Sequence, residues 1–436
     1  MTQYSPPGMR LACLLALALA GQFSPLATAR ADLTLAAAEQ LALSADPAVI
    51  ARESRALALQ EQAIADGQLP DPKLLLGVSN LPLDDFSLKK EPMSQVVAGL
   101  RQAFPRGDTL KYRREYTEWM GRAESAGVRR VRAEILRDVR QTYLELYYQE
   151  QAARIVAQNR NLFEQLVDIT RAHYASGRVS QQDVLQAQLE LSRLDDRATR
   201  IDAQRDIQRA ALARWIGAAA GETLDGEFPP LPALPALSVL EAGLAQHPAI
   251  RSASARVQAG QRQVMEAREQ YKPGFDVGVE YRKRFGNNAD GSDRPDMMAA
   301  LLTLDLPVFS DKRQDKHLSA SRLQTEVAVQ LREQALRELQ RTLAGDYARW
   351  QRLGEQQRLY RDHLLREAAD NAEAAVHAYQ SGTTEFTALV RARIGELDIR
   401  LQAIRIRVDR AAAHARLLYL LPDAENTASS AMGEQP

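Results

Sequence analysis

The feature that most constrains this chain is a repeat that relates its two halves. Tyr-x-Ser-Gly occurs at 174–177 and again at 379–382, 205 positions later, each time within an otherwise helical stretch. Two further landmarks recur in the same order, at offsets of 201 and 202: Asp46-Pro47 with His247-Pro248, and Pro105 with Pro307. Landmarks in one order at a nearly constant offset indicate internal duplication, so both halves should contain the same sequence of elements.

Each half contains two segments in which apolar and polar residues alternate, which is the pattern of β-strands. The clearer pair spans 275–282 and 298–306, and a less regular pair spans 74–80 and 95–104. Polar loops would connect the strands of each pair. One face of the clearer pair would hold Phe275, Val277, Val279 and Tyr281 from one strand and Met298, Ala300, Leu302, Leu304 and Leu306 from the other.

Four strands of about ten residues each have the length of transmembrane β-strands. Four strands cannot close a useful barrel, however, and bare strand edges are not tolerated in lipid. A location in the membrane would therefore require several chains to share one barrel. The alternative is a small soluble sheet.

The remaining sequence predicts helices that are too long for a compact globule. No proline occurs between 106 and 174, and the apolar residues follow helical spacing there. Steps of three and four residues across 187–201 and 394–408 form the heptad pattern of coiled coils. A helix of about 65 residues would be roughly 100 Å long.

The repeated motif marks the positions where these helices should turn back. Gly177 and Gly382 suit such turns, because glycine tolerates the left-handed backbone that ends many helices. Ser180 and Thr384 are placed to start the helices that follow. The motif therefore predicts the tips of two helical hairpins.

Residues 1–31 have the features of a secretory signal peptide. Arg10 precedes an apolar run at 11–20, and Ala29 and Ala31 offer an Ala-x-Ala cleavage site. The only cysteine, Cys13, lies in this segment, so the mature chain could form neither a disulfide nor a thiolate metal site. No later apolar run is long enough for a transmembrane helix.

The repeat and the distribution of proline divide the rest of the chain. A stretch with four prolines reads as a linker between the halves, and the C-terminal residues are small and polar. The first repeat is predicted at 32–220, with strands at about 73–104 and a helical hairpin at about 106–217. A linker at 221–238 follows. The second repeat is predicted at 239–421, with strands at about 275–308 and a hairpin at about 311–421, and a flexible tail occupies 422–436.

Composition and motifs argue against enzymes and nucleic-acid-binding proteins. The chain has 56 basic and 56 acidic side chains, so its zero formal net charge gives no reason to expect nucleic acid. The six histidines show no zinc-hydrolase spacing, and no nucleophile elbow or phosphate loop occurs. Met297 and Met298 are more typical of packing than of a copper site. We predict no enzyme activity, no cofactor and no metal site.

The order of elements, the duplication, the Tyr-x-x-Gly tips and the run Ser-Gly-x-x-Ser-x-x-Asp-Val-Leu at 176–185 resemble the TolC-type outer-membrane efflux proteins. The resemblance covers the chain from about Leu33 to Leu421. Within that family, segments 67–80, 102–113 and 304–314 are most similar to the cation-efflux branch, which serves heavy-metal pumps.

The resemblance implies a mainly α fold with a small β part, in which a duplicated protomer carries long coiled-coil hairpins and four transmembrane strands. It implies a homotrimer in the outer membrane of a Gram-negative cell, with one 12-stranded β-barrel continued by a periplasmic α-helical tunnel, and with the linker and tail around the waist. The partners would be outer-membrane lipid, a periplasmic adaptor (membrane-fusion) protein and an inner-membrane pump of the RND type.

In that family the tip turns contact the adaptor protein. The resemblance therefore implies that the adaptor-contact residues of this chain are Ser176, Gly177, Arg178, Val179, Ser180, Ser381, Gly382, Thr383 and Thr384.

Acidic rings narrow the periplasmic mouth in the family, and Asp183 keeps the first-half aspartate of that motif. The second half departs from it, because Ala388 and Arg391 occupy positions where many relatives carry aspartates. The closed-state network of those relatives therefore does not transfer, and Glu385 is the nearby acid. Asp183 and Glu385 are candidates for a gate or selectivity role; the alternative is that both stabilise the starts of helices.

The leading hypothesis for function is a passive exit duct of a tripartite efflux system, which carries heavy-metal cations delivered by an inner-membrane pump. One alternative is an outer-membrane duct for drug efflux or type I protein secretion. The other is a periplasmic coiled-coil scaffold without a pore.

Overall fold

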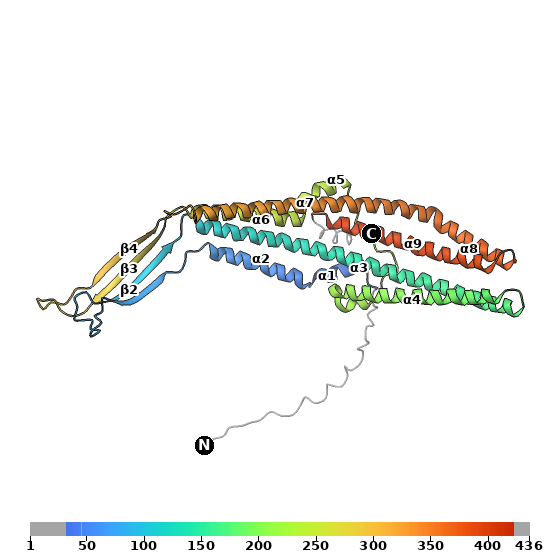
Figure 1. The fold of residues 1–436 in the computed structure, drawn as a ribbon, viewed down its shortest axis with the longest axis horizontal. Coiled ribbons are helices and arrows are strands. Elements are labelled where there is room, and N and C mark those ends of the chain that lie inside the picture. The colour runs from blue at the N-terminus through green and yellow to red at the C-terminus, as the bar shows by residue number, and fades with distance from the viewer. Residues whose placement is uncertain (1–31, 45, 423–436) are drawn as a thin grey trace, which may run out of the picture.

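The computed structural model describes residues 32–44 and 46–422, so the predicted signal peptide and nearly all of the predicted tail lie outside the described residues. The described part is an elongated body with a β-sheet at one end and long paired helices toward the other (Figure 1). Helices dominate and the sheet is small, which confirms the predicted fold class.

The sheet consists of β1 (Lys73–Ser79), β2 (Gln95–Phe104), β3 (Gly274–Arg284) and β4 (Met297–Asp305). Neighbouring strands are antiparallel, and their order in space is their order along the chain. Each half of the chain thus contributes one hairpin, and the hairpins join along β2 and β3. Among the described residues, the outer edges of β1 and β4 have no partner strand.

Each half also contributes one long helical hairpin. The first is α3 (Thr109–Ala175), a helix of 67 residues, followed by α4 (Gln181–Ile216). At about 1.5 Å per residue α3 is roughly 100 Å long, as the proline-free sequence predicted.

The second hairpin has the same length but not the same continuity. It runs through α7 (Gln314–Leu359), a π-helical turn η3 (Tyr360–Leu364) and α8 (Leu365–Gln380), and returns as α9 (Phe386–Tyr419). The first three have 46, 5 and 16 residues, which together match the 67 of α3.

Shorter helices precede the strands in each half. The first half has α1 (Leu35–Ser44) and α2 (Pro47–Asp66), and the second has α5 (Leu237–Gly243), η2 (Leu244–Gln246) and α6 (Pro248–Glu269). A short turn, η1 (Gly217–Gly221), follows α4. Both α2 and α6 start with proline, which has no N–H to leave unpaired at this position.

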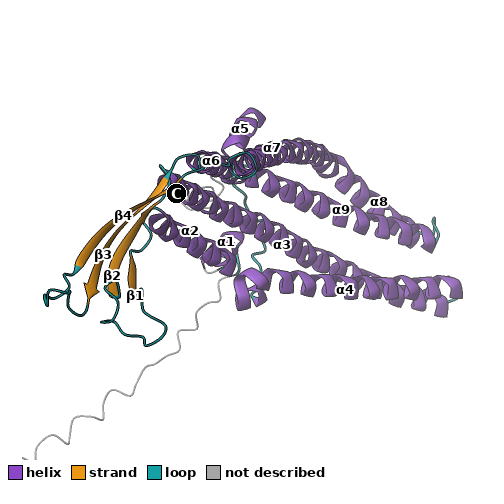
Figure 2. Ribbon diagram, turned by 60° about the vertical axis from the view of Figure 1, so that its left-hand side comes forward, coloured by secondary structure: helices purple, strands orange, loops and turns teal. Residues whose placement is uncertain are grey.

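Each strand is continuous with one of the helices, and the helices lie in the same order as the strands. α2 leads into β1, β2 into α3, α6 into β3 and β4 into α7. α2 packs on α3, α3 on α6, and α6 on α7 (Figure 2). The molecule is therefore a layer with two flanks, one made by β1 and α2 and the other by β4 and α7.

Apolar side chains form separate buried clusters along the helical part. One cluster near the middle contains Tyr143, Leu146 and Leu212, and packs α1, α3, α4 and α9 together. Another, toward the tips, draws Phe163 and Leu194 from the first hairpin and Phe386 and Leu397 from the second. The heptad positions predicted from sequence thus form a core between the two hairpins.

A buried ion pair joins α1 to α3 in the middle of the body. The guanidinium of Arg140 donates to both carboxylate oxygens of Glu39, at 2.6 and 3.2 Å, and both side chains are buried. One turn further along α3, the hydroxyl of Tyr143 donates to the carbonyl oxygen of Leu33 at 2.7 Å. These contacts hold the start of the described chain against the long helix.

The segment that was predicted to be a linker packs around the same level. Leu224 forms an isolated parallel bridge with Leu33. Phe228 lies edge-on to the ring of Tyr147 in α3, with a centroid distance of 5.5 Å, and under the guanidinium of Arg407 in α9, at 3.8 Å. The linker therefore contacts one helix from each hairpin.

Candidate functional site: the hairpin tips and the apolar face of the sheet

The first tip is a tight turn around Gly177, whose φ is +71°. The N–H of Gly177 donates to the carbonyl oxygen of Tyr174 at 2.9 Å, and that of Arg178 donates to His173 at 2.9 Å, which closes the end of α3. Ser180 then caps α4. The left-handed glycine and the serine cap predicted from sequence are both confirmed.

Asp183 completes the cap of α4. Its Oδ2 accepts hydrogen bonds from the backbone N–H of Ser180 at 3.0 Å and from the Ser180 hydroxyl at 2.9 Å, and its own N–H donates to Ser180 Oγ at 3.3 Å. This reciprocal arrangement is a capping box. Asp183 is half-buried, so its carboxylate is held in place within a single chain.

The second tip repeats the turn with different side chains. Gly382 has a φ of +73°, and its N–H donates to the carbonyl oxygen of Tyr379 at 3.0 Å. The residue that precedes α9 is Glu385, so the expectation that Thr384 starts this helix was wrong by one residue. The Glu385 carboxylate caps no backbone N–H; its Oε2 accepts from the Thr387 hydroxyl at 3.3 Å.

The predicted adaptor-contact residues lie together in these two turns. Seven of the nine are exposed, and Val179 and Thr384 are half-buried. Arg178 is the one charged side chain in the set. Neither Gly177 nor Gly382 has another atom within 4 Å of the place where a Cβ would stand. The tips are therefore open, small-residue surfaces whose shape depends on the backbone.

Sequence reasoning did not distinguish the two tyrosines of the repeated motif. Tyr174 is exposed, whereas the ring of Tyr379 packs at 5.7 Å from Phe386 and at 6.3 Å from His173 of the first hairpin. Burial raises the pKa of Tyr379, and the side chain of Thr170 in α3 acts against this shift. Tyr379 thus ties the second tip to the first, and only its neighbours in space reveal this.

The sheet presents one continuous apolar face to its surroundings. Register places Leu76 beside Ala98, Ala98 beside Tyr281, and Tyr281 beside Met298. The exposed apolar residues that share this face are Leu74, Leu76, Val78, Leu100, Phe275, Val277, Val279, Tyr281, Met298, Leu302 and Leu304. The alternation predicted for β3 and β4 is confirmed, and an exposed apolar face of this kind marks a contact with another protein or with a membrane.

Aromatic side chains mark both ends of this face. Near the helices, Phe104 and Phe275 stack with a centroid distance of 4.9 Å. Near the loops, the hydroxyl of Tyr281 donates to Asp296. Rings with a polar neighbour at the ends of an apolar band are typical of positions at membrane interfaces.

The opposite face of the sheet carries most of its charged side chains, beside apolar residues that include Leu75 and Met297. The carboxylate of Glu280 is buried and accepts from the guanidinium of Arg282 at 2.8 Å. Gly99 on the neighbouring strand leaves room for it, since a Cβ there would stand 2.8 Å from Glu280 Cγ. Most charged side chains of the strands thus lie on the face opposite the continuous apolar one.

Residues 32–44 and 46–422 contain neither a cluster of potential metal ligands nor an apolar membrane-spanning helix. No group of three or more His, Cys, Asp or Glu side chains in this part of the chain is placed to hold a metal ion. No helix in it is long and apolar enough to cross a membrane.

Most of the chain matches the model of one protein family. The model of the family described as "Outer membrane efflux protein" matches residues 38–218 and 239–421. The chain belongs to this family. The efflux protein lacks a match among curated proteins.

Solved structures with the same fold are similar over most of their length. A membrane protein from Pseudomonas aeruginosa is 17% identical, with a TM-score of 0.76, over 89% of this chain and 90% of that one. CusC is 16% identical, with a TM-score of 0.74, over 88% and 92%. The open-state MtrE channel of Neisseria gonorrhoeae is 16% identical, with a TM-score of 0.75, over 89% and 88%.

Proposed function

We propose that this efflux protein is one protomer of a trimeric outer-membrane channel and serves as the exit duct of a tripartite efflux system. The observation that carries the proposal is the layer with two incomplete flanks. Among the described residues, the outer edge of β1 is unpaired at one flank and the outer edge of β4 at the other, and the sheet between them exposes its apolar face. A strand edge in lipid must find a partner, so β4 of one copy would pair with β1 of the next.

Strand direction is compatible with this pairing. β1 leaves the helical part after α2, and β4 returns to it before α7, so the two strands run in opposite directions. A seam between copies would therefore be antiparallel, like the pairs inside the protomer. Because the joined edges are different, the contact is head-to-tail, and such contacts generate a ring when the rotation between copies closes. Three copies would close a barrel of 12 strands, within the size range of outer-membrane barrels.

The helices beside these edges carry matching apolar stripes. On α2 the exposed residues Ile50, Leu57 and Ile64 recur every seven positions. On α7 the exposed apolar residues include Leu323, Val327 and Leu331, which recur every four positions. Each stripe has helical spacing and lies on a helix continuous with a free strand. We infer that α7 of one copy packs against α2 of the next, which continues the barrel as a helical tunnel.

The tips would be the docking surface for a periplasmic adaptor protein, which links the duct to an inner-membrane pump of the RND type. Support comes from their position at the far end from the sheet, their exposure and their backbone-determined shape (Figure 1). A helix of roughly 100 Å reaches far into the periplasm when the sheet lies in the outer membrane. Energy for export would come from the pump.

Heavy-metal cations are the proposed cargo, on the resemblance of 67–80, 102–113 and 304–314 to the cation-efflux branch. The structural likenesses do not choose a substrate, because CusC and MtrE are equally similar to this fold. Drug efflux or protein secretion is the second candidate. A deletion strain tested against a panel of metals and drugs decides: sensitivity to drugs alone would overturn the metal assignment.

Cross-linking tests the seam. The sequence has no cysteine beyond Cys13 of the predicted signal peptide, so Leu57→Cys can be combined in turn with cysteine at 323, 327 and 331. We expect at least one pair to give covalent dimers and trimers in outer membranes under oxidation. Leu57→Cys with Leu397→Cys is the matched control, because Leu397 is buried inside the protomer. A protein that stays monomeric in detergent, shows no cross-link and gives no conductance in planar bilayers would be a scaffold and not a channel.

A further inference from the structure

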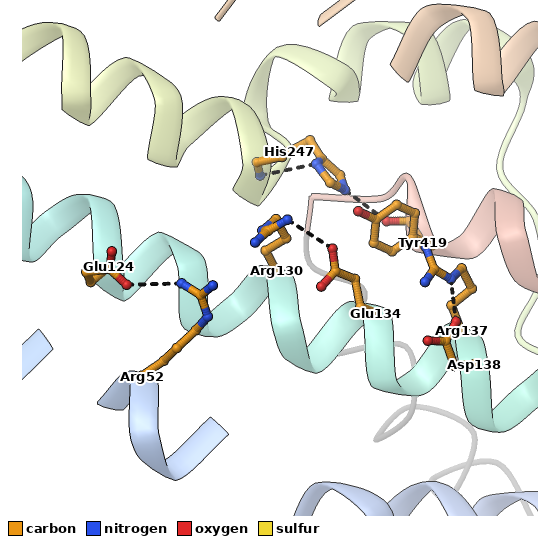
Figure 3. A network of polar contacts seen from close by, with 9 residues as sticks. Arg52, Glu124, Arg130, Glu134, Arg137, Asp138, His247 and Tyr419 are labelled. Atoms are coloured by element: carbon orange, nitrogen blue, oxygen red, sulfur yellow. Dashed lines mark hydrogen bonds and ion pairs between the residues drawn. The ribbon is translucent and has the colours of Figure 1, made fainter. Parts of the chain in front are cut away.

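The start of α6 and the end of α9 meet at one buried histidine. His247 is fully buried; its Nδ1 accepts a hydrogen bond from the backbone N–H of Ala249 at 3.2 Å, and its Nε2 donates one to the carbonyl oxygen of Tyr419 at 3.1 Å (Figure 3). The ring also lies edge-on to that of Tyr419, at 5.0 Å. This pattern requires a neutral imidazole with its proton on Nε2.

The two hydrogen bonds have separate roles. The bond from Ala249 caps α6, since it satisfies an N–H that has no partner within the helix. The bond to Tyr419 fastens the last turn of α9, where Leu417 and Leu420 pack with Leu240 and Leu244. One side chain therefore joins the beginning of the second repeat to its end.

Protonation would break this arrangement. A second proton on Nδ1 would face the N–H of Ala249, so two donors would meet and the cap would be lost. The charged neighbour on α3 is Arg130, already paired with Glu134 at 3.2 Å. Nearby on α9, Arg416 is paired with Asp346 of α7 at 2.7 Å. Among the described residues, no carboxylate lies within ion-pair distance of the ring to compensate a charge.

A second arginine of α3 contacts Tyr419 and is likewise paired with a carboxylate. Arg137 stacks on the Tyr419 ring at 4.9 Å and pairs with Asp138 at 2.7 Å. Burial lowers the pKa of His247 to about 4, with Arg130 acting in the same direction and the Tyr419 carbonyl against it. The folded state thus binds fewer protons than an opened state, so stability falls as the pH falls from 6.5 toward about 4.

We propose that His247 is an acid-sensitive joint whose protonation releases the end of α9 from the start of α6. The first repeat has no such joint. There Asp46 caps α2 by accepting from the N–H of Ala48 at 2.8 Å, so the cap needs no neutral imidazole. The joint lies beside the buried apolar cluster that contains Leu240 and Leu417. Its release would therefore loosen the middle of the body while the tips stay folded.

Hydrogen exchange of the full-length protein in detergent tests the joint locally. Exchange is measured at pH about 7 and about 4.5, and each rate is corrected for the intrinsic exchange rate at that pH. In the wild type, the opening equilibrium constant of peptides spanning 248–252 and 416–421 should be on the order of 50-fold larger at the lower pH. In His247→Asn the rise should fall below about threefold, since asparagine caps helices without titrating. The opening of peptides around Ala48 should change little between the two pH values, both in the wild type and in His247→Asn.

Two further variants keep the test decisive. His247→Ser retains a cap acceptor and does not titrate, so it replaces His247→Asn if the asparagine protein fails to assemble. His414→Gln removes a half-buried histidine of α9, whose pKa burial also lowers. Equal protection of the wild type at both pH values overturns the proposal. It is also overturned if His247→Asn and His247→Ser keep the full acid response, or if His414→Gln alone abolishes it.

Discussion

α3 runs unbroken for 67 residues, whereas the matching stretch of the second half is interrupted by the π-helical turn Tyr360–Leu364. The helical part nevertheless ends in the same way in both halves, at a left-handed glycine. Backbone geometry at the turn has thus been kept while the helix leading to it has changed. A turn depends on one residue type, but the path of a long helix depends on many packing contacts.

The residues that cap the N-termini of the helices also differ between the two halves. In the first half, Asp46 and the Ser180–Asp183 capping box cap the N-termini of α2 and α4 with carboxylate and hydroxyl groups. The second half uses an imidazole at His247 and no side-chain cap at Glu385. Duplicated positions therefore keep their place in the fold but not their chemistry, and each difference below can be tested by treating the two halves as controls for one another.

The largest expected effect concerns ion pairs. Arg140→Ala should destabilise the protein by about 3–5 kcal/mol, because it leaves the carboxylate of Glu39 buried without a partner. Arg416→Ala, in the second half, should cost about 1 kcal/mol, since Arg416 is partly exposed where it meets Asp346. Denaturant unfolding in detergent measures both. Equal losses of unfolding free energy in the two variants would show that burial does not make the Glu39–Arg140 pair more stabilising than the Arg416–Asp346 pair.

Next come the tip glycines. Gly177→Val and Gly382→Val should each abolish efflux while trimers still reach the outer membrane, because a β-branched residue at positive φ costs about 1–3 kcal/mol and distorts the turn. Gly345→Val is the matched control: it also adds a side chain in open space, but within the regular α7 helix. Full resistance in both tip variants would mean that the tips are not the docking surface.

A smaller effect is expected at the π-helical turn. None of the residues Tyr360–Leu364 is buried, whereas Val156 and Asn159 are buried at the corresponding level of α3. Amide hydrogens across the turn should therefore exchange about tenfold faster than those of 155–159, since local opening follows the loss of buried contacts. Equal protection of the two segments would show that contacts between copies, and not the protomer, set stability there.

Local patterns were enough to predict the strands, the heptad core and the two tip glycines, because alternation, spacing and glycine chemistry are properties of neighbouring residues. The contacts that required the structure are long-range. Glu39 and Arg140 are 101 positions apart, and His247 and Tyr419 are 172 apart. The different fates of Tyr174 and Tyr379 are also invisible in the motif, because only the second meets His173.

The π-helical turn could not be read from the sequence either. Residues 360–364 continue a helical pattern without proline or glycine, so nothing local distinguishes them from α3. The error of one residue at the start of α9 has a similar cause. Thr384 is the better cap by residue type, but helix boundaries follow backbone hydrogen bonds, and the N–H of Ala388 donates to the carbonyl oxygen of Glu385.

The smallest expected effect separates two roles of the acids near the tips. In a trimer any acid that faces the lumen becomes a ring of three charges, which favours cations. Asp183→Asn and Glu385→Gln should each lower cation selectivity by about a factor of two if the carboxylates line the mouth. Ser180→Ala is the control, because it weakens the cap of α4 by about 1 kcal/mol without changing charge.

Single-channel recordings of these three variants compare the halves directly. Asp183 is already engaged in the cap, so its neutralisation should alter both selectivity and closed-state conductance, whereas Glu385, exposed and without a backbone cap bond, should alter selectivity alone. If Ser180→Ala reproduces the effect of Asp183→Asn, the aspartate acts through the helix start and not through its charge. If the Asp183→Asn, Glu385→Gln double variant behaves as the wild type, neither acid forms the gate, and apolar side chains must close the mouth.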